Sequence, residues 1–357
     1  MKLGIVGLPN VGKTTLFNAL TGSKAETGAY TVAGAKPNVG VAKVPDERLD
    51  WLAEYYHPKK YSPATIDFVD VAGVSSGGKG NEVFQAIRQV DALVEVVRCF
   101  DDESIFLEKA DAVRDAESFE LELILADIEV VERRLDRAKK NAKSGDKKYK
   151  RECEMCQALI AHLEAEKPAR DFAFTEEDEA ILTDGGLLTV KPMIYAANLD
   201  EAGMSDLAGN ANFQALSAFA AEHGAAVLPV AAKFEEDIAE LDPEEAKMFM
   251  EDLGLTETGL DRLIRTSYDL LGYISFLTAG EDDVHAWTIV RGTKAPKAAG
   301  KIHTDIERGF IRAEIVAFED LKACGSMAAA KEKGHFRLEG KDYVMQDGDV
   351  TMFRFNV

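Results

Sequence analysis

The stretch that decides the fold is Gly7-Leu8-Pro9-Asn10-Val11-Gly12-Lys13-Thr14-Thr15, which fits the phosphate-binding loop pattern GxxxxGK[ST]. The residues before it, Lys2-Leu3-Gly4-Ile5-Val6, predict a short buried strand, and Leu16-Phe17-Asn18-Ala19-Leu20 predict the start of a helix. A strand, a glycine-rich turn and a helix in this order are the context that the pattern requires. The sequence therefore predicts an α/β domain that binds a nucleotide at this loop.

Each residue type in the loop has a physical role. Gly7 and Gly12 let successive backbone N–H groups turn towards phosphate oxygens, and the helix N-terminus adds a partial positive charge. Lys13 places a charge between the β- and γ-phosphates and is the expected catalytic residue, while the Thr14 hydroxyl is an expected Mg²⁺ ligand. The loop residues expected to contact the nucleotide are Asn10, Val11, Gly12, Lys13, Thr14 and Thr15.

A second motif follows a second predicted strand. Residues 65–70 read as a strand that ends in Asp70-Val71-Ala72-Gly73. Downstream of a phosphate-binding loop, this DxxG pattern predicts that Asp70 holds Mg²⁺ through water and that Gly73 contacts the γ-phosphate. The residues that follow, 75–81, are rich in Ser and Gly and predict a loop, for which a switch segment and a plain surface loop remain equal interpretations.

The composition is that of a soluble globular protein. The 357 residues, 46% hydrophobic and 29% charged, are enough for two or three domains. No apolar run approaches the roughly 20 residues that span a bilayer, and the chain enters the loop strand without room for a signal peptide. Four cysteines make no disulfide framework, so we expect a reduced, cytoplasmic protein without a membrane partner.

Charge is distributed unevenly along the chain. The net charge of −21 argues against general affinity for nucleic acid, and no recognition of DNA sequence is expected. Residues 133–151, however, hold ten Lys or Arg and two Asp, so this segment carries +8 and the rest −29. We call it the basic tip. It is a candidate docking surface for a polyanion, and a solvated helix face is the alternative interpretation.

An insertion separates two predicted strands, 92–97 and 192–197. A parallel crossover needs about a dozen residues, far fewer than the distance between them. Apolar residues spaced by three and four predict two helices here, with Ser144-Gly145-Asp146 as the turn, so the basic tip lies at the end of a helical hairpin. Cys153 and Cys156 fall on the apolar stripe, which favours core packing over a metal or redox site.

The remainder of the chain completes one domain and begins another. A strand at 226–230 and helices at 243–253 and 259–271 close the nucleotide-binding domain. Beyond it, short strands at 286–290, 310–316, 343–345 and 350–355, with one helix near 318–324, predict a small β-rich domain. The expected domains are 1–113 with 186–273 for nucleotide binding, 114–185 for the hairpin insertion and 274–357 for the β-domain.

The nucleobase is expected to meet Asn198-Leu199-Asp200-Glu201. Guanine-specific P-loop proteins read the base with NKxD, whose Asp accepts hydrogen bonds from guanine. Here Leu199 replaces the Lys and Glu201 replaces the Asp, with a carboxylate one methylene further out. Losing the guanine-reading partner relaxes selection for guanine. We assign Asn198, Leu199 and Glu201 to base recognition, together with Ala232 after the next strand.

These motifs together resemble the YchF family of Obg-like ATPases across nearly the whole chain. The matching stretches are GLPNVGKTT at 7–15, PNVG at 37–40, VPDERLD at 44–50, DVAG at 70–73, NLDE at 198–201, AGKIHTDIERGFIRAE at 299–314 and QDGDVTMFRFNV at 346–357. The resemblance implies a P-loop domain with a doubly wound sheet, an inserted helical hairpin and a C-terminal TGS domain of β-grasp shape. It also implies a preference for ATP, a potassium ion near Asn10 and association with ribosomes.

Two departures from the family pattern fall where the γ-phosphate is sensed. The alignment places Gly34 where relatives carry a switch Thr, with Thr31 three residues earlier, and the loop after DVAG is shortened. As in the family, the residue after DxxG is apolar, Val74, so the usual water-orienting side chain is missing.

We therefore expect an ATP-hydrolysing P-loop switch protein that uses Mg²⁺, with K⁺ as a second candidate ion, and that binds the ribosome or another large ribonucleoprotein. Two alternatives stay open. One is a GTPase or an enzyme of dual specificity, and the other is a nucleotide-gated binding module whose hydrolysis is vestigial.

Overall fold

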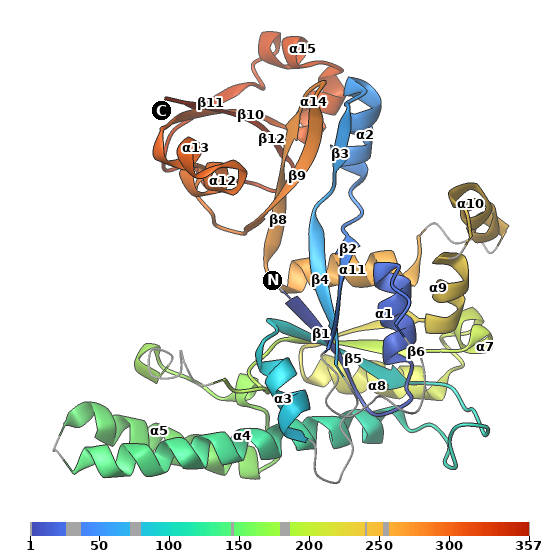
Figure 1. The fold of residues 1–357 in the computed structure, drawn as a ribbon, viewed down its shortest axis with the longest axis vertical. Coiled ribbons are helices and arrows are strands. Elements are labelled where there is room, and N and C mark those ends of the chain that lie inside the picture. Colours follow the sequence, from blue (N-terminus) through green and yellow to red (C-terminus); the bar gives the residue numbers. More distant parts are fainter. Residues whose placement is uncertain are drawn as a thin grey trace. The chain divides into compact units, whose positions relative to one another are not determined.

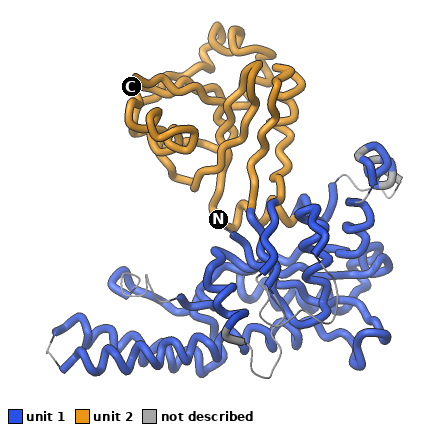
Figure 2. Tube along the Cα trace, in the orientation of Figure 1, with its two compact units in different colours: residues 1–41, 67–262 blue, residues 42–66, 263–357 orange. Residues whose placement is uncertain are grey.

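The structure, a computed structural model, describes residues 2–25, 37–71, 80–143, 146–178, 186–239, 241–252 and 257–356. The chain divides into two compact units, coloured separately in Figure 2. The first unit comprises residues 1–41 and 67–262, and the second comprises residues 42–66 and 263–357. In the described part of the chain, every helix is too short or too polar to cross a bilayer.

The first sheet carries the phosphate-binding loop. Its strand order is β2-β4-β1-β5-β6-β7, and the ladders joining β4, β1, β5, β6 and β7 are parallel. The strands are β1 (Lys2–Val6), β2 (Asn38–Lys43), β4 (Thr65–Asp70), β5 (Ala92–Arg98), β6 (Met193–Asn198) and β7 (Ala226–Val230). Every residue of β5 and β6 is buried, as expected for central strands covered on both faces.

The described helices between β1 and residue 272, apart from Glu47–Tyr56, cover this sheet or extend from it (Figure 1). They are α1 (Lys13–Thr21), α3 (Gly80–Arg88), α4 (Ala112–Ala142), α5 (Lys147–Glu164), η1 (Ala169–Asp171), α7 (Glu201–Ser205), α8 (Ala211–Glu222), α9 (Ala232–Ala239), α10 (Pro243–Asp252) and α11 (Gly259–Leu270). The predicted helix after the loop is confirmed, although it begins at Lys13 rather than Leu16. Gly80 and Asn81, predicted to lie in a loop, form the start of α3.

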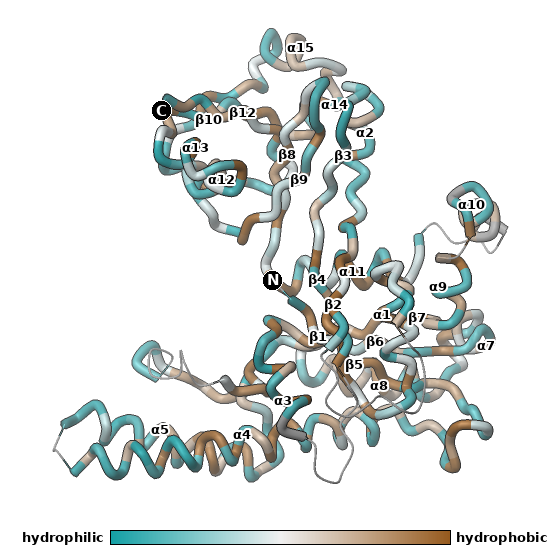
Figure 3. The backbone as a smooth tube through the Cα atoms, viewed as in Figure 1, coloured by the Kyte–Doolittle hydropathy of each residue, from teal (hydrophilic) through white to brown (hydrophobic). Residues whose placement is uncertain are grey.

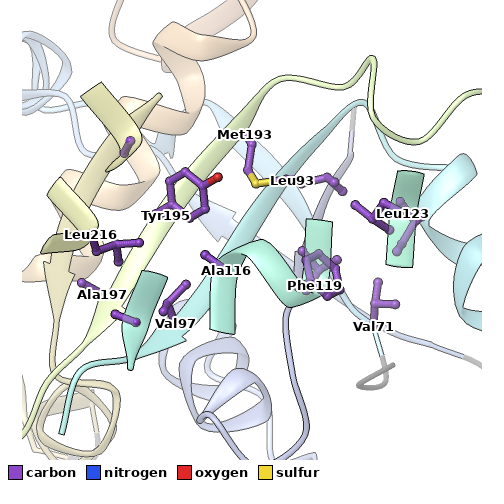
Figure 4. Packing of buried hydrophobic residues seen from close by; sticks show 14 of the residues in the cluster. Val71, Leu93, Val97, Ala116, Phe119, Leu123, Met193, Tyr195, Ala197 and Leu216 are labelled. Atoms are coloured by element: carbon purple, nitrogen blue, oxygen red, sulfur yellow. The ribbon is translucent and has the colours of Figure 1, made fainter. Parts of the chain in front are cut away.

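One face of the sheet packs on the first half of α4. Leu93 and Val97 from β5 and Met193 and Tyr195 from β6 lie against Ala116, Phe119 and Leu123 of that helix (Figure 4). These side chains are all at most 4% exposed, so the first half of α4 lies in the core of the first unit. The apolar spacing in residues 121–135 predicts the helix, but Leu121 and Leu125, two of its members, are exposed.

The rest of the insertion forms the expected antiparallel hairpin of α4 and α5 (Figure 1). It has a core of its own, made by residues of both helices with η1 and Leu187. Cys156 is fully buried in that core and Cys153 is packed against it, which confirms the packing interpretation for both cysteines. Figure 3 shows hydrophilic chain at the far end of the hairpin, where residues 133–151 place the basic tip.

The second unit contains a mixed sheet of order β11-β10-β12-β8-β9-β3. Its elements are α2 (Glu47–Tyr56), β3 (Lys60–Ser62), β8 (Tyr273–Ala279), β9 (Asp283–Val290), α12 (Ala295–Ile302), α13 (Thr304–Arg308), β10 (Phe310–Ala317), α14 (Phe318–Cys324), α15 (Met327–Glu332), β11 (Arg337–Glu339) and β12 (Asp349–Phe355). Helix α12 packs on β8, β9, β10 and β12 through a shared apolar core. This is the arrangement expected of a β-grasp domain.

Several details of this unit differ from the sequence predictions. Residues 343–345 are not a strand, because only an isolated bridge joins Val344 to Lys294. The described residues of the region hold three further helices, α12, α13 and α15, besides the predicted one at 318–324.

Residues 42–66, expected inside the nucleotide-binding domain, belong to the second compact unit. Strand β3 pairs with β9, and Arg48 on α2 forms an ion pair of 2.8 Å with Asp347. The division into three domains with the expected boundaries remains a prediction.

Candidate active site

The phosphate-binding loop has the backbone geometry that its glycines allow. Gly7 and Gly12 have φ values of 133° and 99°, and Asn10 has φ of 64°. A side chain is excluded at both glycines, because a Cβ at Gly7 would lie 2.6 Å from the Val96 carbonyl oxygen and one at Gly12 would lie 2.4 Å from Asn198 Nδ2. The loop is therefore a tight turn closed against β5 and β6.

Lys13 begins α1 and is almost completely buried, with 7% of its surface exposed. Its ammonium group donates to the Leu8 carbonyl at 2.6 Å, across the loop. Burial lowers the pKa of Lys13 to about 8, and the nearby Asp70 carboxylate limits this decrease. The cation is thus held within the loop, where the sequence predicts that phosphate oxygens bind.

Thr14 and Asp70 meet beside this cation. Thr14 Oγ1 donates to Asp70 Oδ2 at 3.0 Å, and Asp70 ends β4, the strand that neighbours β1. Burial raises the pKa of Asp70, while hydrogen bonds from Thr14 and Asn38 and the charge of Lys13 act in the opposite direction. A hydroxyl and a carboxylate are hard oxygen donors of the kind that Mg²⁺ prefers, so the residues present fit that ion.

Asn38 was missed by the sequence analysis as a site residue. It starts β2 and its side chain hydrogen-bonds to the Asp70 carboxylate. The sequence offered one signal, the PNVG match at 37–40, which was used for the resemblance and not for a role in the site.

Asn198 links the loop to the expected base site. Its Nδ2 donates to the Val11 carbonyl at 2.9 Å, and its Oδ1 accepts from the Ala232 N–H at 3.0 Å. Asn198 ends β6, and Ala232 follows β7, the next strand of the sheet. Residues far apart in the sequence therefore meet at the carboxyl edge of parallel strands, which is where α/β proteins bind ligands.

The other residues assigned to the base differ in their exposure. The Leu199 side chain is 3% exposed and packs in the core with Leu216, so it does not lie on an open site. Asp200 caps α7 by accepting from the Gly203 N–H at 2.8 Å. Glu201 is exposed in the first turn of that helix. The buried Leu199 side chain supplies no stem that could lie along a base, as its type predicts, and the assignment of Leu199 and Glu201 to base recognition stays a prediction.

The other loop residues expected to contact the nucleotide differ in burial. Val11 is buried, Thr15 is half-buried and Asn10 is exposed at the rim of the loop. Gly73, Val74, Thr31 and Gly34 lie outside the described residues. Among the residues that are described, no group of three or more His, Cys, Asp or Glu side chains could hold a metal.

The fold and this site define the class. A parallel sheet whose first strand leads into a loop with a buried Lys, followed by a Thr–Asp pair, is the architecture of a P-loop nucleoside triphosphatase. In agreement, residues 2–132 match the family model described as 50S ribosome-binding GTPase, and residues 273–356 match the C-terminal model of YchF GTPases, described as a protein of unknown function.

Full-length relatives narrow the class further. The ribosome-binding ATPase YchF of Bacillus subtilis is 52% identical over 361 residues, covering 99% of each chain. The protein of the same name from Escherichia coli O157:H7 is 45% identical over 363 residues, covering 100% of this chain and 99% of the relative. The solved structure of the Schizosaccharomyces pombe YchF GTPase superposes with a TM-score of 0.86 at 35% identity, covering 99% of this chain and 97% of that one. The chain belongs to the YchF family.

Proposed function

We propose that the protein binds Mg·ATP at residues 7–15 and hydrolyses the γ-phosphate. The observation that carries this proposal is the cluster of Lys13, Thr14 and Asp70. In it the buried Lys13 ammonium lies near Asp70, whose Oδ2 accepts a hydrogen bond of 3.0 Å from Thr14 Oγ1. The names of the curated relatives, which are ribosome-binding ATPases, support it.

The chain's own groups account for most of the chemistry. The loop N–H groups and Lys13 hold the phosphates and stabilise the charge that develops as water attacks in line. Thr14 and Asp70 would hold Mg²⁺, Asp70 through a water molecule. When bound, the ion neutralises charge on the β- and γ-phosphates. We extend the proposal to K⁺ at Asn10, whose exposed side chain lies at the rim of the loop.

For the nucleobase we propose ATP in preference to GTP. Leu199 is buried, so the base would meet the Asn198 end of β6 and the exposed Glu201 without a Lys stem along its ring. Asp200 is used as a helix cap, which leaves Glu201 as the free carboxylate of this segment. Without the guanine-reading Asp, selection for guanine should be weak. GTP remains the alternative substrate.

For the partner we propose the cytoplasmic ribosome, contacted through the basic tip. Lys139, Lys140, Lys147 and Lys148 of the tip are exposed. Arg134 and Arg151 are not equally available, because Arg134 pairs with Glu152 and Arg151 pairs with Asp178, each at 2.7 Å. Because the rest of the chain is strongly acidic, we expect weak binding to free RNA and firmer binding to a large ribonucleoprotein that offers several contacts.

Lys13→Ala tests the proposed catalytic site. We expect the affinity for Mg·ATP to fall by at least about a hundredfold, because the variant removes the buried cation that faces the phosphates. Single-turnover hydrolysis of γ-labelled ATP should be lost with it. Lys167→Ala, at an exposed position on the insertion, is the control. Full ATP binding by Lys13→Ala would contradict the site, and a wild-type protein that binds but never hydrolyses ATP would favour the vestigial binding module.

A further inference from the structure

One face of α1 contacts β4, β2 and the segment that follows the helix. Thr14, Asn18 and Thr21 are spaced by four and three residues and therefore share a face of the helix. Thr14 Oγ1 reaches Asp70 at the end of β4. The two other residues of this face are not used by the proposed chemistry.

Asn18 holds Ala25 with both ends of its side-chain amide. Its Nδ2 donates to the Ala25 carbonyl and its Oδ1 accepts from the Ala25 N–H, each at 2.9 Å. Asn18 is only 7% exposed, in a helix segment that is otherwise apolar. A buried Asn with two opposed backbone partners on one residue fixes the position and the orientation of that residue.

Thr21 contacts β2 on the same face. A Cβ built at Gly40 would lie 2.6 Å from Thr21 Cβ, so strand and helix touch directly at this glycine. Two residues earlier on β2, the Asn38 side chain hydrogen-bonds to Asp70. The carboxylate is thus reached from α1 through Thr14 and from β2 through Asn38.

We propose that Asn18 is a positioning residue for the Mg²⁺ pair. Thr21 lies in direct contact with β2 at Gly40. By holding the segment after α1 at Ala25, Asn18 keeps the helix in the register that places Thr14 Oγ1 3.0 Å from Asp70 Oδ2. Asn18 touches neither nucleotide nor metal in this proposal. It acts through α1 on Thr14. The inference rests on the proposed use of Mg²⁺ at this site.

The test separates Mg²⁺ binding from phosphate binding. Equilibrium titrations with ATP are made in EDTA and over a Mg²⁺ series, with wild type, Asn18→Ala and Gly40→Ala. We define the Mg²⁺ midpoint as the Mg²⁺ concentration at which the gain in ATP affinity is half complete. We expect Asn18→Ala to change the ATP Kd in EDTA less than twofold and to raise this midpoint at least tenfold. Gly40→Ala should raise the midpoint as well, because the new methyl group pushes β2 away from Thr21 and leaves both Asn18–Ala25 hydrogen bonds, here called the Asn18 clamp, in place.

Thermal unfolding without nucleotide shows that each variant is folded. Asn212→Ala is the control, since Asn212 also lies on a helix and accepts a backbone N–H, that of Ala112, away from Asp70. If Asn18→Ala and Gly40→Ala lower Tm but leave the Mg²⁺ midpoint within twofold of Asn212→Ala, the clamp only stabilises the fold and the inference is wrong. If the ATP affinity of wild type does not respond to Mg²⁺, the proposed metal site itself fails, and this inference with it.

Discussion

Glu235 is a buried carboxyl group on α9, the helix that begins at Ala232, whose N–H donates to Asn198. It is 3% exposed, and its Oε1 accepts from the Gly259 N–H at 2.7 Å. Burial raises the pKa of Glu235 to about 7, with Asp261 adding to the effect and Arg262 opposing it. Its Oε2 is buried without a hydrogen-bond partner. The folded protein therefore holds this proton more tightly than the unfolded chain.

Glu235→Gln should change the pH dependence of stability. A raised carboxyl pKa means that stability is highest below the unfolded value of 4.5 and decreases as the pH rises to about 7. The loss attributable to Glu235 is on the order of 3 kcal/mol. Gln keeps the acceptor for Gly259 but does not titrate. The free energy of unfolding, measured with urea between pH 4.5 and 8, should change less with pH for the variant than for wild type. An identical pH dependence of the two would contradict the assignment.

Residue identities in the loop could be predicted, but side-chain directions could not. The pattern GxxxxGK[ST] names Lys13 and Thr14 because spacing alone defines it. Leu199 was assigned to the base because it occupies the Lys position of a motif, whereas its burial depends on the core cluster of the first unit, which brings together residues far apart in the sequence. Asn38 was missed because its partner, Asp70, lies on another strand.

At the scale of elements, α4 joins the sheet to the hairpin, and Asp127 fixes it near its midpoint. This side chain is fully buried and accepts from the Leu188 N–H at 2.8 Å, the Thr189 N–H at 2.9 Å and Thr189 Oγ1 at 2.7 Å. Arg170 in η1 pairs with Glu120 of α4 in the same region. The helix is therefore tied to the segment that leads into β6.

Asp127→Ala should destabilise the protein by on the order of 3 kcal/mol, since it leaves three donors buried without an acceptor. Asp136→Ala, an exposed position on the same helix, should change stability by less than about 0.5 kcal/mol. Chemical unfolding measures both. Equal effects of the two substitutions would show that the bonds to the segment 188–189 contribute little.

Charge reversal of Lys139, Lys140, Lys147 and Lys148 to Glu tests the basic tip. Co-sedimentation with ribosomes should fall sharply and its salt sensitivity should decrease, because fewer phosphates are neutralised. ATP binding should be unchanged.

Two double variants with the same change in net charge separate the effect of where the charges lie from the effect of net charge alone. Reversal of Lys109 and Lys167, exposed lysines of the same unit outside the tip, gives the same change in charge as reversal of Lys139 and Lys140. If both pairs reduce sedimentation equally, or neither does, the tip is a solvated helix face and the ribosome contact lies elsewhere.

Long periodic elements could be predicted and short paired ones could not. The stripe in residues 121–135 predicted α4 because 31 residues of helix repeat the same spacing many times. Strand β3 has only three residues, and its strand structure depends on pairing with β9, which lies more than 200 positions later in the sequence. Residues 343–345 alternate like a strand, yet the ladder next to β10 is formed by β11.

At the scale of the whole molecule, neither compact unit is a continuous stretch of chain. Residues 42–66, from the end of β2 to the start of β4, belong to the second unit, and there Trp51 packs edge-on against Phe318. A chain cut after residue 262 would leave the apolar face of α2 without these partners. Local sequence gives no signal that these two segments of the chain, 42–66 and 263–357, pack together in one compact unit.

The central claim is that residues 7–15 bind ATP in preference to GTP for hydrolysis. Parallel equilibrium titrations of the wild-type protein with labelled ATP and GTP in Mg²⁺ test it most directly, followed by single-turnover hydrolysis of each with and without ribosomes. We predict a lower Kd for ATP than for GTP and measurable cleavage of ATP. A GTP Kd tenfold below that of ATP would contradict the claim.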